Sequence, residues 1–182
     1  MIELEVEDVL VRLRPDVDEQ RRVPPDAASV ASDKRVVILK EADGERRMPI
    51  WTGAFEGDMI ALGLRLRAGS AKLIAATSPP RPMSHDLMAQ LIRTLGGAVG
   101  RIKITGRRDA TYYARVEVAT AGGSEELDAR PSDALALAVR TEVPIVVDED
   151  VFAEAGRPQA AVMEELGIRA PPGKWQSLLA AN

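Results

Sequence analysis

Residues 125–140 have the sequence EELDARPSDALALAVR, which places a short strand directly before a helix. Residues 125–128 are expected to form a short strand, Pro131 suits a first helical turn, and the run of Ala, Leu and Val that follows predicts an apolar helix. Residues 58–65, DMIALGLR, match residues 133–140, DALALAVR, at Asp, Ala, Leu and Arg, and both follow a predicted strand. We therefore infer two related strand-helix units in one sheet, each helix beginning with an acid that complements the positive end of its dipole.

The rest of the chain continues these strand and helix signals. Acidic and apolar residues alternate from residue 2 to residue 13, and an Asp-Gly pair at residues 43–44 separates two apolar runs, which predicts a hairpin. The predicted strands are residues 2–13, 36–41, 46–51, 99–106, 110–120, 125–128 and 144–147, and the predicted helices are residues 54–67, 84–95, 131–140, 149–155 and 159–166. This order predicts an α+β fold in which helices pack on a mixed β-sheet.

The helix over residues 84–95 has the most regular apolar spacing. Ser84 is expected to be its N-cap, and Gly96 the left-handed residue after its end. The apolar stripe, which we expect to face the core, consists of Leu87, Met88, Leu91, Ile92 and Leu95. Asp86 and Arg93 fall on the opposite side, which is expected to face solvent.

Composition excludes several classes of function. The 182-residue chain has no cysteine and one histidine, which excludes thiolate zinc sites, thiol nucleophiles and a two-histidine zinc site within one chain. A net charge of −4 and 3% aromatic residues argue against non-specific coating of nucleic acid, so any such contact should be confined to a patch. No run of about 18 apolar residues could span a bilayer and the first ten residues lack a secretory signal, so we expect a cytoplasmic protein that does not enter the membrane.

Four segments together carry a resemblance to a known family. They are residues 49–53 (PIWTG) with Glu56, residues 81–87 (RPMSHDL), residues 111–114 (TYYA), and residues 128–134 (DARPSDA) with their continuation to Arg140 and Pro144-Ile145. In order and spacing they resemble the bifunctional nuclease family. The likeness covers residues 1–156, which we take as the domain. Within it, residues 14–34 form a proline-bearing loop longer than the family usually has, and residues 157–182 form a C-terminal helical extension.

The resemblance implies a mixed-sheet domain that commonly self-associates and acts as a nuclease on RNA and DNA. Phosphodiester hydrolysis needs a positioned water, stabilisation of phosphoryl charge and usually a divalent cation, for which carboxylates suggest Mg²⁺ or Mn²⁺. Within the motifs, the candidate catalytic residues are Asp128, Asp133, His85 and Glu56, of which Asp128 and Asp133 are also the candidate metal ligands. The candidate substrate-binding residues are Arg81, Arg130 and Ser132. Arginines clamp phosphate oxygens, and a hydroxyl beside a helix N-terminus favours an anion.

Folding alone offers a second explanation of the same residues. Ser132 and Asp133 can cap the helix that follows, and Arg130 can pair with Asp133 or Asp128. His85 can serve as a general acid or base near neutral pH, or it can hydrogen-bond the loop before its helix.

The predicted hairpin of residues 99–120 offers a second surface for phosphate. Its outward cations are Arg101, Lys103 and Arg115, with Arg107 and Arg108 in the turn. In a competing interpretation, Lys103 opposes Glu117 across the strands and these charges serve folding. Trp51 and Tyr113 could stack on a base, although we favour a packing role for Trp51.

The leading function is thus a metal-assisted nuclease acting on RNA and DNA. The alternative is a non-enzymatic module that binds nucleic acid, a ligand or a protein. A third interpretation is a structural homo-oligomer whose exposed strand edges pair between subunits.

Overall fold

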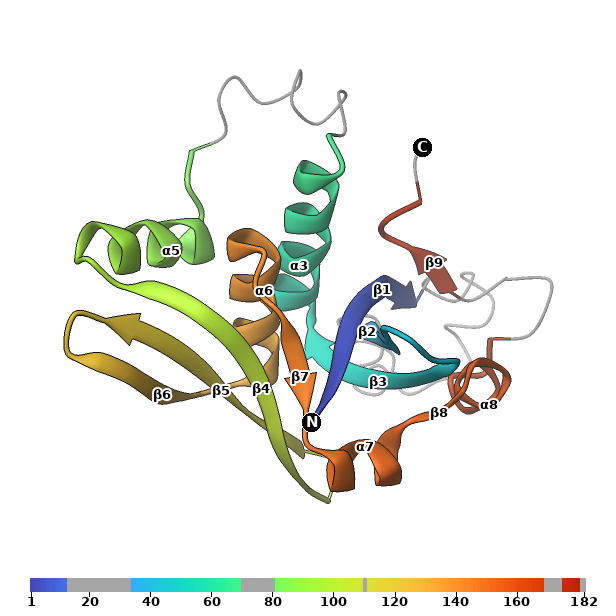
Figure 1. The fold of residues 1–182 in the computed structure, drawn as a ribbon. Coiled ribbons are helices and arrows are strands. Elements are labelled where there is room, and N and C mark those ends of the chain that lie inside the picture. Colours follow the sequence, from blue (N-terminus) through green and yellow to red (C-terminus); the bar gives the residue numbers. More distant parts are fainter. Residues whose placement is uncertain (13–33, 70–80, 110, 169–174, 181–182) are drawn as a thin grey trace.

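The computed structural model describes residues 1–12, 34–69, 81–109, 111–168 and 175–180, which form one mixed nine-stranded sheet with helices packed on it (Figure 1). The strands are β1 (Ile2–Arg12), β2 (Lys34–Glu41), β3 (Arg46–Gly53), β4 (Ala98–Arg108), β5 (Thr111–Thr120), β6 (Gly123–Ala129), β7 (Ile145–Val147), β8 (Arg157–Pro158) and β9 (Trp175–Ser177). The helices are α3 (Ala54–Arg67), α5 (Ser84–Thr94), α6 (Pro131–Thr141), α7 (Glu149–Ala155) and α8 (Gln159–Glu165). The predicted α+β fold is confirmed.

The sheet consists of two three-stranded meanders with β7 between them. β1, β2 and β3 pair antiparallel in sequence, and so do β4, β5 and β6. β7 is parallel to β4 and antiparallel to β1, which gives the order β6-β5-β4-β7-β1-β2-β3-β8. Each meander leads into a helix, α3 or α6, and the two helices lie side by side against the sheet (Figure 1). This repeat of strands and helix agrees with the inferred duplication.

The two helices begin differently in one respect. Asp133 lies in the first turn of α6, as predicted. In α3, however, the first-turn acid is Glu56, whereas Asp58 lies two residues later and pairs with Arg35 of β2 at 2.8 Å. The prediction that Asp58 begins its helix was therefore wrong.

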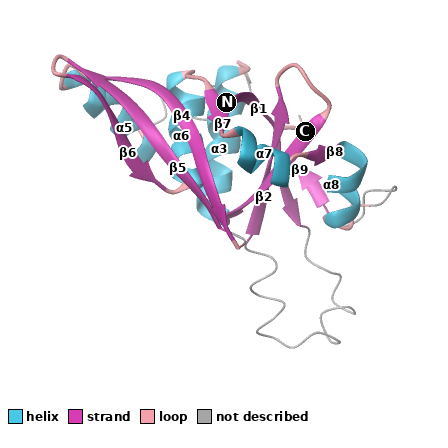
Figure 2. Ribbon diagram, turned by 60° about the horizontal axis from the view of Figure 1, so that its bottom comes forward, coloured by secondary structure: helices cyan, strands magenta, loops and turns pink. Residues whose placement is uncertain are grey.

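Both faces of the sheet are covered around β1 and β2, and β1 contributes to both clusters. The main core packs one face against α3 and α6. On the opposite face, Val36 and Ile38 pack with α8 and with Trp175 of β9 (Figure 2). A register shift between Val6 and Asp8 interrupts the alternation, so Leu4 and Val9, an odd number of residues apart, both lie in the main core, while Leu10 lies in the second cluster.

Helix α5 presents its apolar stripe to solvent, so the predicted orientation was wrong. Four side chains of the stripe are exposed: Leu87, Met88, Leu91 and Leu95. The side of the helix that faces the protein carries His85, which is buried, and Asp86, whose Oδ1 accepts a 2.6 Å bond from Arg140 Nε of α6. Polar contacts to α6 therefore orient α5 more strongly than its apolar periodicity does. Asp86, expected in solvent, is a partly buried partner of a buried arginine.

The ends of α5 and the remaining segments complete the comparison. Met83, not Ser84, is the N-cap, because the Asp86 carboxylate accepts the Met83 backbone N–H at 2.9 Å. Gly96 has the expected positive φ of 80°. The loop predicted at residues 14–34 lies almost entirely outside the described residues. β8 pairs with β3 and β9 with β1, so the described part of the C-terminal extension joins the same sheet. Among the described residues, no helix is long and apolar enough to span a membrane.

Candidate functional site

A cavity of about 420 Å³ lies where the resembling motifs meet. Its lining comes from residues 50–53 at the end of β3, Glu56 of α3, residues 111–113 at the start of β5, and residues 128–132 at the junction of β6 and α6. Four strands separate β3 from β5 in the sheet, so both can line one cavity only because the sheet curves. The predicted junction therefore does open onto a cavity.

Arg130 is the cation at this cavity. It is the N-cap residue of α6, and its side chain is 69% exposed. Its Nε donates to Asp133 Oδ2 at 2.7 Å, and its Nη2 lies 3.2 Å from Glu56 Oε1. The hydrogen bond to Asp133, and next the charges of Asp133 and Glu56, raise the pKa of Arg130 above its usual value. The guanidinium is thus held in one place while it stays open to a ligand.

His85 supports this arrangement from behind. Its Nε2 lies 3.3 Å from Asp133 Oδ1, and because an ionised carboxylate only accepts, Nε2 carries the proton of this bond. The His85 side chain is 5% exposed and does not line the cavity. Its Nδ1 atom makes no hydrogen bond to any residue that the structure describes. His85 is therefore placed to position Asp133, and its predicted role as a general acid or base stays a prediction.

Glu56 occupies the opposite side of Arg130. Its side chain is largely buried and lines the cavity. A Cβ atom at residue 53 would lie 2.4 Å from Glu56 Oε2, closer than any real contact, so glycine at this position leaves room for the carboxylate. Glu56, Arg130, Asp133 and His85 together form a polar chain from the cavity wall to the interior.

The other predicted site residues lie at different distances from this polar chain of side chains. Asp128 is exposed on β6, opposite Arg115 of β5, and lines the cavity. Ser132 lines it from the first turn of α6. Arg81 is exposed immediately before α5 and is not among the lining residues. The structure thus brings together Glu56, Asp128, Arg130 and Ser132, with Asp133 and His85 behind them and Arg81 outside.

The donor set does not form a ready metal site. Among the described residues, no group of three or more His, Asp or Glu side chains could hold an ion. Both oxygens of Asp133 are engaged, one by Arg130 and the other by His85. The assignment of Asp128 and Asp133 as ligands of Mg²⁺ or Mn²⁺ stays a prediction, and we derive no chemical step through a metal.

Two residues of the lining were missing from the sequence-based candidates. Thr52 is buried and faces the core side of β3, and its hydroxyl has no hydrogen-bond partner among the described residues. Tyr112 is partly buried, which raises the pKa of its phenol, and the Arg107 guanidinium lies 5.5 Å from its ring centre. Strand alternation with Ile50 could have identified Thr52 as an inward polar residue.

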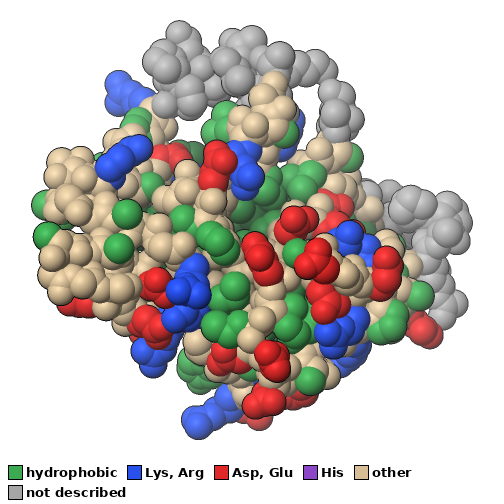
Figure 3. Space-filling model, in the orientation of Figure 1, with side chains coloured by type: hydrophobic (Ala, Val, Ile, Leu, Met, Phe, Trp, Pro, Cys, Tyr) green, Lys and Arg blue, Asp and Glu red, His purple; other side chains and the backbone are tan. Residues whose placement is uncertain are grey.

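The cations of the β4–β5 hairpin are largely paired with acids. Arg101 lies 2.9 Å and Lys103 3.2 Å from Glu117, and Lys103 also bonds Glu126. Arg107 pairs with Glu154 of α7 at 2.9 Å. Lys103 therefore does pair with Glu117 as predicted, but diagonally, because Arg101 is the residue directly opposite Glu117 and Lys103 lies opposite Arg115. Figure 3 shows acidic and basic side chains interspersed over the visible face of the molecule.

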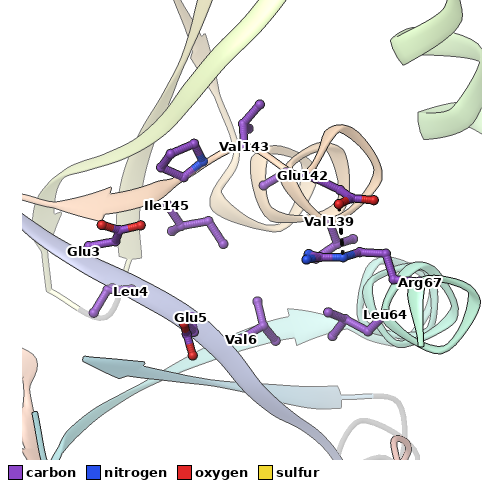
Figure 4. Close-up of a pocket in the computed structure, with 12 residues that line it drawn as sticks. Glu3, Leu4, Glu5, Val6, Leu64, Arg67, Val139, Glu142, Val143 and Ile145 are labelled. Atoms are coloured by element: carbon purple, nitrogen blue, oxygen red, sulfur yellow. Dashed lines mark ion pairs between the residues drawn. The ribbon is translucent and has the colours of Figure 1, made fainter. Parts of the chain in front are cut away.

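A second cavity, of about 440 Å³, lies between β1, α3 and the end of α6 (Figure 4). Its rim is acidic, with Glu3 and Glu5 from β1, and its single cation among the lining residues, Arg67, is 3.8 Å from Glu142. A cavity with this charge does not suit a phosphate, so the cavity beside Arg130 is the better candidate.

Comparison with known proteins adds independent evidence on the motifs. A family model described as the bifunctional nuclease domain matches residues 37–160. An uncharacterized protein of Mycobacterium tuberculosis is 38% identical over 121 residues, which cover 66% of this chain and 66% of that protein. Bifunctional nuclease 1 of rice, Oryza sativa subsp. japonica, is 36% identical over 121 residues, which cover 63% of this chain and 33% of the rice protein. Bifunctional nuclease 1 of Arabidopsis thaliana is 31% identical over 72 residues, which cover 38% of this chain and 22% of that protein.

Proposed function

Because this chain belongs to the bifunctional nuclease domain family, we propose that it hydrolyses phosphodiester bonds of RNA and DNA at the cavity beside Arg130. The rice and Arabidopsis relatives are named bifunctional nucleases, and the matched regions cover only 33% and 22% of those longer proteins. The observation that carries the proposal is the chain of contacts from Glu56 through Arg130 and Asp133 to His85, which borders an open cavity.

Each residue of this chain of contacts has a role that its position supports. The exposed guanidinium of Arg130 donates hydrogen bonds to the non-bridging oxygens of a phosphate and stabilises their developing charge. Asp133 holds Arg130 in place through the 2.7 Å bond, and His85 in turn positions Asp133. The hydroxyl of Ser132 and the N-terminal end of α6 favour the same anion.

Glu56 is the candidate general base. In the proposed reaction, its carboxylate accepts a proton from a water molecule whose oxygen forms a bond to phosphorus. The bond between phosphorus and the leaving oxygen breaks, and that oxygen takes a proton from solvent. Glu56 lines the cavity while its Oε1 stays beside Arg130, so base and phosphate-binding group are adjacent.

Cleavage of labelled RNA and single-stranded DNA by the purified protein tests this proposal. The Glu56→Gln variant keeps the shape of the side chain but cannot accept the proton, so it should lose activity by about 100-fold or more. Full activity of this variant would remove Glu56 from the mechanism, and wild-type protein without activity on either substrate would overturn the proposal.

The predicted metal dependence needs a separate comparison. If Asp128 and Asp133 were ligands of one ion, the Asp128→Asn and Asp133→Asn variants should lose nuclease activity to a similar extent. Excess Mg²⁺ or Mn²⁺ should then restore part of that activity. Because Asp133 is bonded to both Arg130 and His85, we expect Asp133→Asn to reduce nuclease activity more than Asp128→Asn does. Neither Mg²⁺ nor Mn²⁺ should restore the lost activity. Equal losses that the cation reverses would establish the metal site instead.

A binding module without catalysis is the second candidate. It is favoured by the two carboxylates beside Arg130, which offset much of the charge that a transition state would need. Saturable binding of an oligonucleotide that is never cleaved would support this alternative.

The cytoplasmic location stays a prediction.

We also propose that the predicted self-association uses the exposed stripe of α5. Leu87, Leu91 and Leu95 are half or more exposed, and monomeric proteins rarely leave such a patch uncovered. A second copy related by two-fold symmetry would bury the stripe of each chain against the other.

A further inference from the structure

The cavity beside Arg130 combines one cation with exposed aromatic rings. Trp51 is 51% and Tyr113 45% exposed, and both line the cavity with Arg130. Large aromatic side chains are normally covered, whereas Trp51 makes an edge contact with the ring of Trp175 at 5.8 Å and still leaves about half of its surface exposed. The packing role expected for Trp51 therefore accounts for only part of its surface.

The charge of the lining argues against a duplex as the ligand. Arg130 is the only Lys or Arg among the described residues that line the cavity, and Glu56 and Asp128 line it too. Proteins bind duplex nucleic acid by neutralising many phosphates, which a single cation between two acids cannot do. Single strands are instead bound largely through bases stacked on aromatic rings, with fewer charges needed.

The size of the cavity fits a single base. Its volume, about 420 Å³, lies in the usual range for pockets that hold one small molecule.

We propose that this cavity holds one unpaired nucleobase of a single strand, stacked on Trp51 and Tyr113, next to a phosphate bound by Arg130. The inference rests on the proposed function, since it places the substrate of the same site. It selects single-stranded RNA or DNA, or an unpaired end or loop, over an intact duplex.

Binding without cleavage tests the inference separately from the nuclease activity. The probe is a fluorescein-labelled oligothymidylate, and anisotropy is followed with the Glu56→Gln variant so that the probe stays intact. Its matched control is an oligonucleotide of the same length whose sugars carry no bases. Removing one stacked base should weaken binding by about 5-fold or more, so the abasic probe should bind at least that much more weakly. A duplex of the same length should also bind more weakly.

Variants then assign the effect to the rings. Trp51→Ala and Tyr113→Ala should each weaken binding of the oligothymidylate by about 5-fold or more. Trp51→Phe, which keeps an aromatic ring, should retain most of the binding. Phe55→Ala is the matched control, because Phe55 is 53% exposed but does not line the cavity. Circular dichroism checks that each variant is folded.

Two further results separate the two proposals. Equal binding of the abasic and base-carrying probes by the Glu56→Gln protein would overturn the stacking inference, and equal or tighter binding of the duplex would overturn the preference for single strands. Cleavage that persists in that case leaves the nuclease proposal standing. Base-dependent binding by a protein that cleaves nothing would instead remove the nuclease proposal and keep the inference.

Discussion

Replacing Arg130 by alanine separates a functional role from a structural one. The Arg130 side chain is 69% exposed, and its two carboxylate partners compete with solvent. Exposed ion pairs contribute at most about 1 kcal/mol to the free energy of unfolding, so the melting temperature of a chain this size should fall by no more than about 4 °C. Removing a donor that stabilises charge in a transition state, by contrast, typically reduces kcat by about 100- to 1,000-fold.

The assay compares rates and stabilities of three variants. Arg130→Ala should lose about 100-fold or more in cleavage of labelled RNA. Arg130→Lys should keep a part of the activity, because lysine retains the charge but lacks the planar guanidinium that contacts both Asp133 and Glu56. Arg115→Ala is the control, since Arg115 is also exposed and its nearest carboxylate oxygen, of Glu126, is 4.0 Å away. Cleavage that survives Arg130→Ala, or that falls equally in Arg115→Ala, would refute the role of Arg130 at the phosphate.

Three further perturbations follow from the contacts. Gly53→Ala should leave the fold intact, because the atom it meets is the mobile end of Glu56, but the displaced carboxylate should reduce cleavage by about 10-fold or more while thermal melting stays nearly unchanged. Leu91→Glu places a charge in the exposed stripe of α5 and should reduce the mass measured by light scattering to the 19.6 kDa of one chain; wild-type protein that is already monomeric would contradict the assembly. The hydrogen bond from Lys103 lowers the pKa of Glu117 below its ordinary 4.5, so this carboxylate stabilises the fold above pH 4.5 and the contribution is lost as the pH falls through the lower pKa of the folded state. Urea unfolding at a series of acidic pH values should therefore show a smaller pH dependence for Glu117→Gln than for wild type, and parallel curves would argue against the pair.

Local signals predicted most elements because the interactions that form them are local. The Asp-Gly pair at residues 43–44 does separate two strands, β2 and β3, and Pro131 does occupy the first turn of α6. The outward placement of Arg101 and Arg115 in the β4–β5 hairpin was also correct, since their side chains are nearly half exposed while the alternate residues Ile102 and Ile104 are fully buried. In each case the residues that determine the element lie within a few positions of one another.

The cavity could not be predicted in the same way, because its walls come from segments that only the curvature of the sheet brings together. β3 and β5 are not neighbours in the sheet, and nothing in either strand specifies that Trp51 and Tyr113 line the same cavity. The motifs did indicate Glu56 and Arg130 separately. Their contact, at 3.2 Å, became visible only in three dimensions.

The orientation of α5 shows why a clear apolar period was misleading. Arg140 is buried in α6, where its Nη1 donates to the backbone oxygens of Met59 and Ala136 and its Nε to Asp86. A buried guanidinium without a carboxylate would be far more costly than a few exposed leucines, so the polar partners decide which side of α5 faces inward.

The same orientation builds the candidate site. His85 and Asp86 are adjacent on α5, and their partners on α6, Asp133 and Arg140, are two helical turns apart on one side of that helix. The Asp86–Arg140 pair therefore fixes α5 at one end of α6, and this placement brings His85 to Asp133 at the other end. Since Asp133 holds Arg130, the position of the exposed cation depends on a helix whose apolar side is left in solvent. An α5 rotated to bury its leucines would take both polar partners away from α6, and Asp133 Oδ1 would lose the His85 contact that helps to orient it toward Arg130.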